Sequence, residues 1–230
     1  MDAAFLTFEI IGTVAFAISG AIVAIDKETD LFGVLFLAVI TSFGGGIIRD
    51  TLIGNTPPLF FTNYIPVISC IVSALAVFIV ARLFKRGYIA KEKAVCNINN
   101  YFDALGLGVF AVAGTEVCIK AGFTNPFIAI TLGMISAVGG GMIRDLILRE
   151  IPFVLCKRIY AVAALFGASL YYLLDYLGVP YVICASSGIA LVFVVRICAT
   201  VFKWSLPKAI VFSSLKTDTE KDSEPETLTK

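Results

Sequence analysis

The chain contains no histidine and a single tryptophan, and its six cysteines show no C-x-x-C spacing. Without histidine, imidazole-based zinc sites, Ser-His-Asp triads and most proton relays are excluded. Most of the cysteines lie in or beside apolar runs, where cysteine behaves as a small hydrophobic residue, so no disulfide framework is indicated. No serine or cysteine lies beside a plausible base. We therefore predict no enzyme activity, no catalytic residue, no metal site and no cofactor.

Charged residues are also scarce. They make up 15% of the chain, and the net charge of +1 gives no indication of a nucleic-acid partner. The hydrophobic share is 59% and the mean hydropathy is +0.94, whereas soluble domains are about 45–50% apolar. The composition predicts a polytopic membrane protein in contact with the lipid bilayer. The N-terminus carries Asp2 and Glu9 instead of the basic region of a signal peptide, so we expect the first span to be retained.

Hydropathy predicts an all-α fold with seven transmembrane helices, because a membrane-crossing helix needs about 20 largely apolar residues. The qualifying segments are residues 5–25, 31–53, 64–84, 102–120, 126–148, 159–177 and 180–203. Residues 85–101 are basic and polar, and we expect them to link two halves of the protein. Residues 205–230 are charged and contain proline, which predicts a disordered tail.

The distribution of lysine and arginine predicts the orientation of these spans. If the N-terminus lies outside, the only cation of the outer loops is Lys120, at the edge of a span. The inner loops then hold Lys27, Arg82, Lys85, Arg86, Lys91, Lys93, Arg149, Lys157 and Arg158. We therefore predict a multi-pass protein of the plasma (inner) membrane with an external N-terminus and a cytoplasmic C-terminus.

The chain repeats itself. FEIIGTVAFAISG (8–20) aligns with FDALGLGVFAVAG (102–114), and TSFGGGIIRD (41–50) aligns with SAVGGGMIRD (136–145). Each copy holds three spans, and an odd number reverses the membrane orientation of the second copy, as in transporters with inverted repeats. The predicted domains are a first three-helix repeat (1–84), a cytoplasmic linker (85–101), an inverted second repeat (102–178), a seventh helix (179–204) and the cytoplasmic tail (205–230).

Each copy carries a glycine triplet in its second span. The first triplet is Gly44, Gly45 and Gly46, and the second is Gly139, Gly140 and Gly141. Because glycine costs about 1 kcal/mol per helical position relative to alanine, we expect a break in both helices that lines a pathway. Freed carbonyls there could coordinate a cation, and a new helix N-terminus could hold a carboxylate. The alternative is that the triplets only permit close packing of unbroken helices.

An arginine and an aspartate follow each triplet: Arg49 and Asp50 in the first copy, Arg144 and Asp145 in the second. An arginine inside the membrane is costly and is usually paired. The predicted depths suggest two pairs, Glu9 with Arg49 near the outer face and Asp103 with Arg144 near the inner face. We hypothesise that these pairs gate a central cavity, with helix stapling as the alternative. The two aspartates are expected to accept backbone hydrogen bonds or to cap their neighbours.

The repeated GGGxxRD motif on this plan resembles a bacterial membrane family that carries the glycine-transporter domain twice, a family similar in plan to the trimeric intracellular cation channels. The matching stretches include FAISGA (16–21), DLFG (30–33), TSFGGGIIRD (41–50), FDALGLGVFAVAGT (102–115), AVGGGMIRDLI (137–147), IPFVL (151–155) and YAVAALFGASLY (160–171). The resemblance implies a homotrimer with one pore per protomer. It also implies second and fifth helices broken at the glycines, with the triplets lining the pathway and the Arg-Asp pairs completing the motif.

Two functions remain open from the sequence. One is transport of a small solute, with glycine as the first expectation, through a pathway lined by the broken helices. The other is a monovalent-cation channel for potassium or sodium, although the chain has no TVGYG-like filter. A purely structural role would leave the inverted repeat unexplained.

Overall fold

The computed structural model describes residues 3–83, 92–156, 159–202 and 204, and this part of the chain is helical, with no strand. The long helices are α1 (Ala3–Asp26), α2 (Leu31–Leu52), α4 (Tyr64–Leu83), α6 (Glu92–Lys120), α7 (Pro126–Ile147), α9 (Ala161–Tyr176) and α10 (Tyr181–Val201). Two short helices, α3 (Leu59–Thr62) and α8 (Phe153–Cys156), lie in connections. Within the described residues, six helices are long and apolar enough to cross a membrane, and α9 is a shorter apolar helix of 16 residues. The predicted seven-helix fold class is confirmed.

The second helix of each repeat starts at a side-chain cap. The carboxylate of Asp30 accepts a hydrogen bond from the Gly33 amide at 2.8 Å, just before α2. Asn125 caps α7 by accepting from the Phe127 amide at 2.9 Å, with proline at the first helical position. Such caps satisfy backbone donors that the first turn leaves free, so short polar residues between apolar runs place the start of each helix.

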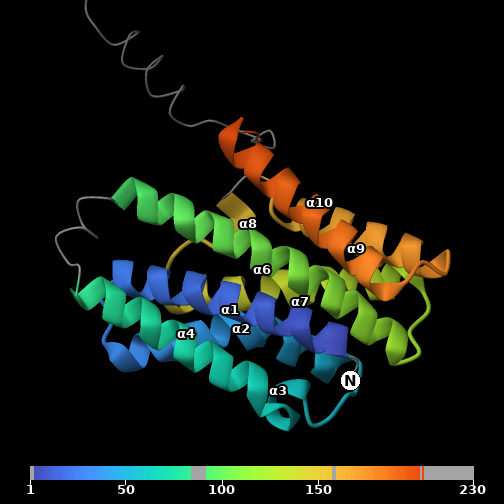
Figure 1. Cartoon of the computed structure of the whole chain (residues 1–230), viewed down its shortest axis with the longest axis horizontal. Coiled ribbons are helices and arrows are strands. Elements are labelled where there is room, and N and C mark those ends of the chain that lie inside the picture. Colours follow the sequence, from blue (N-terminus) through green and yellow to red (C-terminus); the bar gives the residue numbers. More distant parts are fainter. Residues whose placement is uncertain (1–2, 84–91, 157–158, 203, 205–230) are drawn as a thin grey trace, which may run out of the picture.

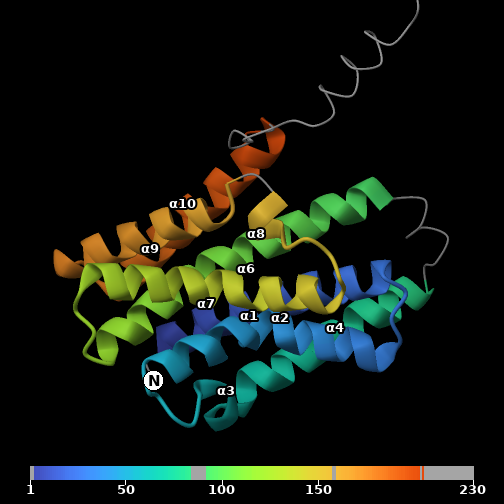
Figure 2. The same ribbon diagram turned by 180° about the vertical axis from the view of Figure 1, so that it is seen from behind.

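The two repeats pack side by side as inverted units. Helices α1, α2, α6 and α7 form the centre, with α1 against α6 and α2 against α7. Helix α4 covers α1 and α2 on one side, while α9 and α10 cover α6 and α7 on the other (Figures 1 and 2). The units α1–α2–α4 and α6–α7–α9 therefore occupy equivalent places, and α10 belongs to neither. We name the two ends of the bundle the Lys120 end, where α1 begins and α6 finishes, and the Lys27 end, where the reverse holds.

Helices α2 and α7 are continuous through both glycine triplets, so the predicted break is wrong. The triplets instead let the two helices cross closely. A Cβ added to Gly45 would overlap the carbonyl oxygen of Ser136, and a Cβ added to Gly140 would overlap that of Thr41. Removing two side chains at the crossing therefore permits backbone contact that any larger residue would prevent. The propensity cost of glycine is offset by this packing, and the helices stay intact.

Helices α1 and α6 approach in the same manner. A Cβ on Gly12 would lie 2.5 Å from the Val109 side chain, and one on Gly106 would overlap the ring of Phe16. The rings of Phe16 and Phe110 stack beside these glycines with centroids 5.2 Å apart and an angle of 12° between their planes. Gly12 and Gly106 therefore let α1 and α6 pack closely against each other.

Helix α6 begins earlier than predicted, at Glu92 rather than near residue 102. Its added turns find polar partners instead of lipid. The side-chain oxygen of Asn99 accepts a hydrogen bond from Ser19 at 2.8 Å, and the Asn100 amide donates to Thr200 at 3.0 Å. Polar residues that looked like part of a linker thus join α6 to α1 and to α10.

Two predicted segments lie wholly or partly outside the described residues. Residues 85–91 of the predicted linker lie outside the described residues, and its remaining residues, 92–101, are helical. The predicted disordered tail, residues 205–230, lies outside them as well.

Candidate functional site

The first Arg-Asp pair forms a compact buried unit at the Lys120 end of α2. Arg49 Nε donates to Asp50 Oδ1 at 2.9 Å, and the other carboxylate oxygen of Asp50 accepts the Leu59 amide at 2.9 Å. Arg49 also donates to Ser136 Oγ of α7 at 3.2 Å. The unit therefore ties the start of α3 to α2 and joins the two repeats.

The second pair repeats this geometry at the Lys27 end. Arg144 Nε donates to Asp145 Oδ1 at 2.9 Å, and Asp145 Oδ2 accepts the Phe153 amide at the start of α8, also at 2.9 Å. Arg144 donates to Ser19 Oγ of α1 at 3.2 Å. Both aspartates thus accept a backbone hydrogen bond, which is one of the two roles expected from the sequence. A charge-assisted hydrogen bond to the adjacent aspartate gives each arginine the partner that it needs inside a membrane.

Asp103 lies between two arginines. Its Oδ1 is 3.8 Å from Arg144 NH1, so the contact predicted for this pair is present, and its Oδ2 is 3.5 Å from Arg196 NH2 on α10. Arg196 also donates to Asn100 Oδ1 at 3.0 Å and lies 4.6 Å from the centroid of the Tyr160 ring. The seventh helix therefore inserts a buried cation into the second repeat. Whether Asp103 and Arg144 gate a pathway stays a prediction.

Sequence reasoning missed Arg196. The signal was available, because Arg196 is the only charged residue within α10 and an arginine inside an apolar span is a functional candidate by default. What the sequence could not supply was its partner, since Asp103 lies on a helix far away along the chain.

The outer pair predicted between Glu9 and Arg49 is not formed in the part of the chain that the structure describes. Arg49 pairs with its neighbour Asp50 at 2.7 Å. Glu9 Oε2 is buried and has no hydrogen-bond partner among the described residues. Glu9 and Arg49 nevertheless line the same small cavity, of about 20 Å³, together with Ser42 and Gly46. The unit with Asp50 satisfies the arginine and leaves the glutamate facing this space.

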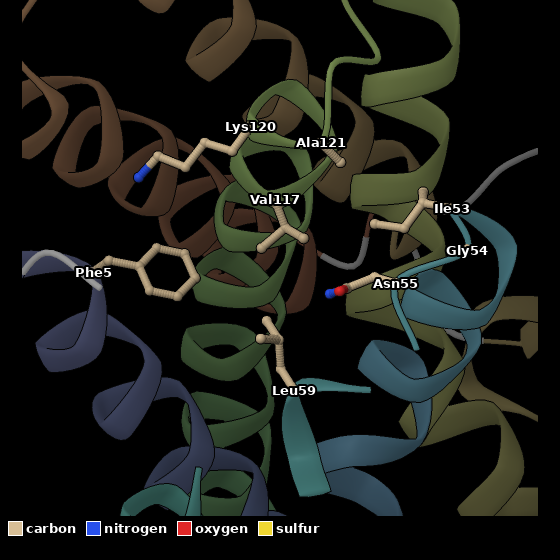
Figure 3. A pocket seen from close by; sticks show the side chains of 8 residues that line it. All are labelled: Phe5, Ile53, Gly54, Asn55, Leu59, Val117, Lys120 and Ala121. Carbon is tan, nitrogen blue, oxygen red and sulfur yellow. The ribbon is translucent and has the colours of Figure 1, made fainter. Parts of the chain in front are cut away.

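A wider cavity of about 620 Å³ opens beside it at the Lys120 end. Figure 3 shows its walls, with the Asn55 side chain directed into the space between α6 and the α2–α3 connection. Phe5 and Leu59 line both this cavity and the small one, so the two are neighbours. Lys120 borders the wide cavity but is held by Glu116 at 2.7 Å and lies over the Phe5 ring. Together the two cavities form a wide entrance that narrows toward Glu9.

The equivalent cavity at the Lys27 end is closed. Its walls include Gly141, Arg144, Asp145 and Tyr160, and it leaves no space for a water-sized molecule. The third glycine of each triplet therefore faces a cavity, Gly46 at one end and Gly141 at the other, while the first two pack at the helix crossing. The candidate pathway consists of two charged cavities on opposite sides of the α2–α7 crossing.

An inverted pair of three-helix units with buried charges on either side of a central crossing defines a polytopic membrane transport protein. Two segments of the chain, residues 6–82 and 100–176, match the Glycine transporter family. The chain belongs to this family and carries its domain twice.

The curated relatives that the chain matches are membrane proteins, and the match covers most of their length. The chain is 42% identical over 168 residues to a UPF0126 membrane protein of Deinococcus radiodurans, which covers 72% of this chain and 74% of that protein. It is 34% identical over 203 residues to the UPF0126 inner membrane protein YadS of Escherichia coli, which covers 86% of this chain and 93% of that protein.

A solved structure shares the fold. The chain is similar to the TRIC trimeric intracellular cation channel orthologue from Rhodobacter sphaeroides, with a TM-score of 0.77 and 34% identity. The likeness covers 86% of this chain and 98% of that one. Both the family match and this structure therefore point to movement of a solute or ion across a membrane.

Proposed function

We propose that the protein is a channel for monovalent cations. The observation that carries the proposal is the size and charge of the cavity beside Glu9 and Arg49, where about 20 Å³ is open to a water-sized particle. A buried site needs roughly 10–15 Å³ of such space to hold one water, so this constriction suits single small ions rather than an amino acid. The likeness to a cation channel orthologue supports the same assignment.

Glycine transport is the second candidate, and the family description favours it. The wide cavity at the Lys120 end, about 620 Å³, falls within the range of roughly 300–1,000 Å³ that ligand pockets occupy. Its polar side chains are those of Asn55 and Lys120, however, and the ammonium of Lys120 is engaged by Glu116. A glycine carboxylate would therefore have to compete with that ion pair.

We also propose that the protein works as a homotrimer in the plasma (inner) membrane, with the Lys120 end outside and the Lys27 end cytoplasmic. The trimer is supported by the similar TRIC orthologue, and the membrane by the similar inner membrane protein YadS. Light scattering of the purified protein, corrected for bound detergent, tests the trimer. A monomer mass in several mild detergents would contradict it.

The functional test is electrical. The purified full chain is reconstituted in planar bilayers with asymmetric KCl, and glycine is then added. We expect unitary, cation-selective currents that glycine does not change. Silent bilayers together with saturable uptake of labelled glycine into liposomes from the same preparation would overturn the channel and establish the carrier.

A matched pair of variants links the current to the candidate pathway. Gly46→Ala adds a methyl group to the small cavity, where the nearest atom, Arg49 NH2, would lie 3.6 Å away. We expect a smaller unitary current. Ser69→Ala on α4 removes a hydroxyl that bonds only its own helix, to the Ile65 carbonyl, and should leave the current unchanged. Equal currents in the two variants would place the pathway elsewhere.

A further inference from the structure

The two charged cavities differ in their balance of charge although their repeats align. Glu9 occupies in the first repeat the place that Asp103 occupies in the second, and Arg49 corresponds to Arg144. At the Lys27 end, Asp103 faces both Arg144 and Arg196. Helix α10, which supplies Arg196, has no counterpart in the first repeat. The symmetry between the two ends is therefore broken by one positive charge.

At the Lys120 end this imbalance leaves Glu9 uncompensated. The single arginine of the cavity, Arg49, is taken by Asp50 at 2.7 Å and by Ser136. Lys120, nearby, is paired with Glu116. An ionised Glu9 thus adds one negative charge that no cation of the cavity neutralises, and a buried charge without a partner is costly.

The cavity beside Glu9 has space for a small cation that would supply the missing positive charge. Glu9 Oε2 is buried and without a hydrogen-bond partner among the described residues, and it borders an open volume of about 20 Å³. The opposite cavity, where the equivalent carboxylate is compensated, has no such space. A carboxylate oxygen without a partner and open volume therefore coincide at the end that has no counterpart of Arg196.

We propose that Glu9 forms a binding site for one monovalent cation at the narrow end of the Lys120-side entrance. The inference deepens the proposed channel function and rests on it for its role, but the site itself can be tested without any current. One carboxylate in excess is neutralised by one monovalent ion, whereas a divalent ion would leave the cavity positive and would need further carboxylates. The ion takes the place that the guanidinium of Arg196 holds in the other repeat.

The test measures ion binding to the purified full chain. Infrared difference spectra are recorded while K⁺ is exchanged for N-methylglucamine, a cation too large for the cavity. We expect carboxylate bands that change with K⁺ and saturate, and that vanish in Glu9→Gln. Asp175→Asn is the matched control: it removes a carboxylate near the end of α9, at the same end of the bundle, that lines neither cavity, and the K⁺-dependent bands should persist.

Gly46→Ala keeps the test decisive if Glu9→Gln does not fold. The added methyl group occupies the cavity and touches only the Arg49 side chain, so we expect the K⁺ concentration for half-saturation to rise by about tenfold or more. Gly141→Ala adds the same methyl group to the opposite cavity and should leave K⁺ binding unchanged. Equal effects of the two alanines would contradict a site at Glu9.

The remaining outcomes separate the site from the channel. Bands that persist in Glu9→Gln, or a Glu9 that stays a protonated carboxylic acid at every K⁺ concentration, overturn the site even if the protein conducts. K⁺-dependent Glu9 bands in a protein that carries no current support the site and overturn the channel.

Discussion

At the scale of single residues, neighbouring glycines of one triplet have different structural roles. Gly45 lies at the helix crossing, where a Cβ would overlap the Ser136 carbonyl, whereas Gly46 faces a cavity and has only the Arg49 guanidinium within reach. The same division recurs at Gly140 and Gly141. A motif of three glycines therefore combines two positions at a close helix crossing with one position that faces a cavity.

This division predicts opposite effects of two adjacent alanine substitutions on stability. Gly45→Ala forces the helices apart and should lower the free energy of unfolding by about 1–3 kcal/mol, the usual range for overpacking. Gly46→Ala meets no backbone and improves helix propensity, so stability should stay equal or rise by up to about 1 kcal/mol. Thermal unfolding of both variants in the same detergent checks this, and a loss in Gly46→Ala as large as that in Gly45→Ala would contradict it.

At the scale of helices, α10 is held to the second repeat by a buried ion pair as well as by packing. Arg196 is 1% exposed and reaches Asp103, Asn100 and the Tyr160 ring. Because breaking one side of a buried pair leaves the other charge without compensation, such losses cost about 3–5 kcal/mol. The seventh helix is therefore part of the charge balance of the Lys27-side cavity and not only a lipid-facing cover.

We expect Arg196→Met to lower the melting temperature strongly and Arg196→Met with Asp103→Asn to recover part of that loss. The control is Arg82→Gln, at an exposed position near the end of α4, where surface substitutions change stability by only about 0.5 kcal/mol. A double-mutant cycle from thermal unfolding gives the coupling energy. Additive losses from the two substitutions would show that Arg196 and Asp103 do not interact.

The helices themselves follow from hydropathy and short polar caps, and the sequence predicts them well because both signals are local. The outcome at the triplets could not be predicted in the same way. Glycine lowers helix propensity whether a helix breaks or packs closely, and only the partner backbone at Ser136 decides between them. Likewise, the early start of α6 depends on Asn99 finding Ser19, and the fate of Glu9 depends on Asp50 satisfying Arg49 first. These outcomes depend on tertiary contacts, which the spacing of residues along the sequence does not reveal.

At the scale of the whole molecule, the inversion of the repeats places their equivalent residues at opposite ends of the bundle, and therefore on opposite sides of the membrane. The proposed orientation has the C-terminus in the cytoplasm, as the lysines and arginines of the predicted inner loops favour. A C-terminal fluorescent-protein fusion should therefore be bright in a bacterial host, and a C-terminal alkaline phosphatase fusion should be inactive. The reverse result would invert the assignment of both ends, and with it the side from which the Glu9 cavity opens.

The inversion of the repeats has a consequence for how the protein responds to voltage. A twofold relation in the membrane plane reverses the component of any dipole along the membrane normal, so the Arg49–Asp50 and Arg144–Asp145 units oppose one another in an electric field. Moving one charge across the membrane changes the energy by about 2.3 kcal/mol per 100 mV. Arg196 comes from α10, outside the repeats, so the ion pair that it forms with Asp103 has no inverted counterpart and its dipole is not cancelled in this way.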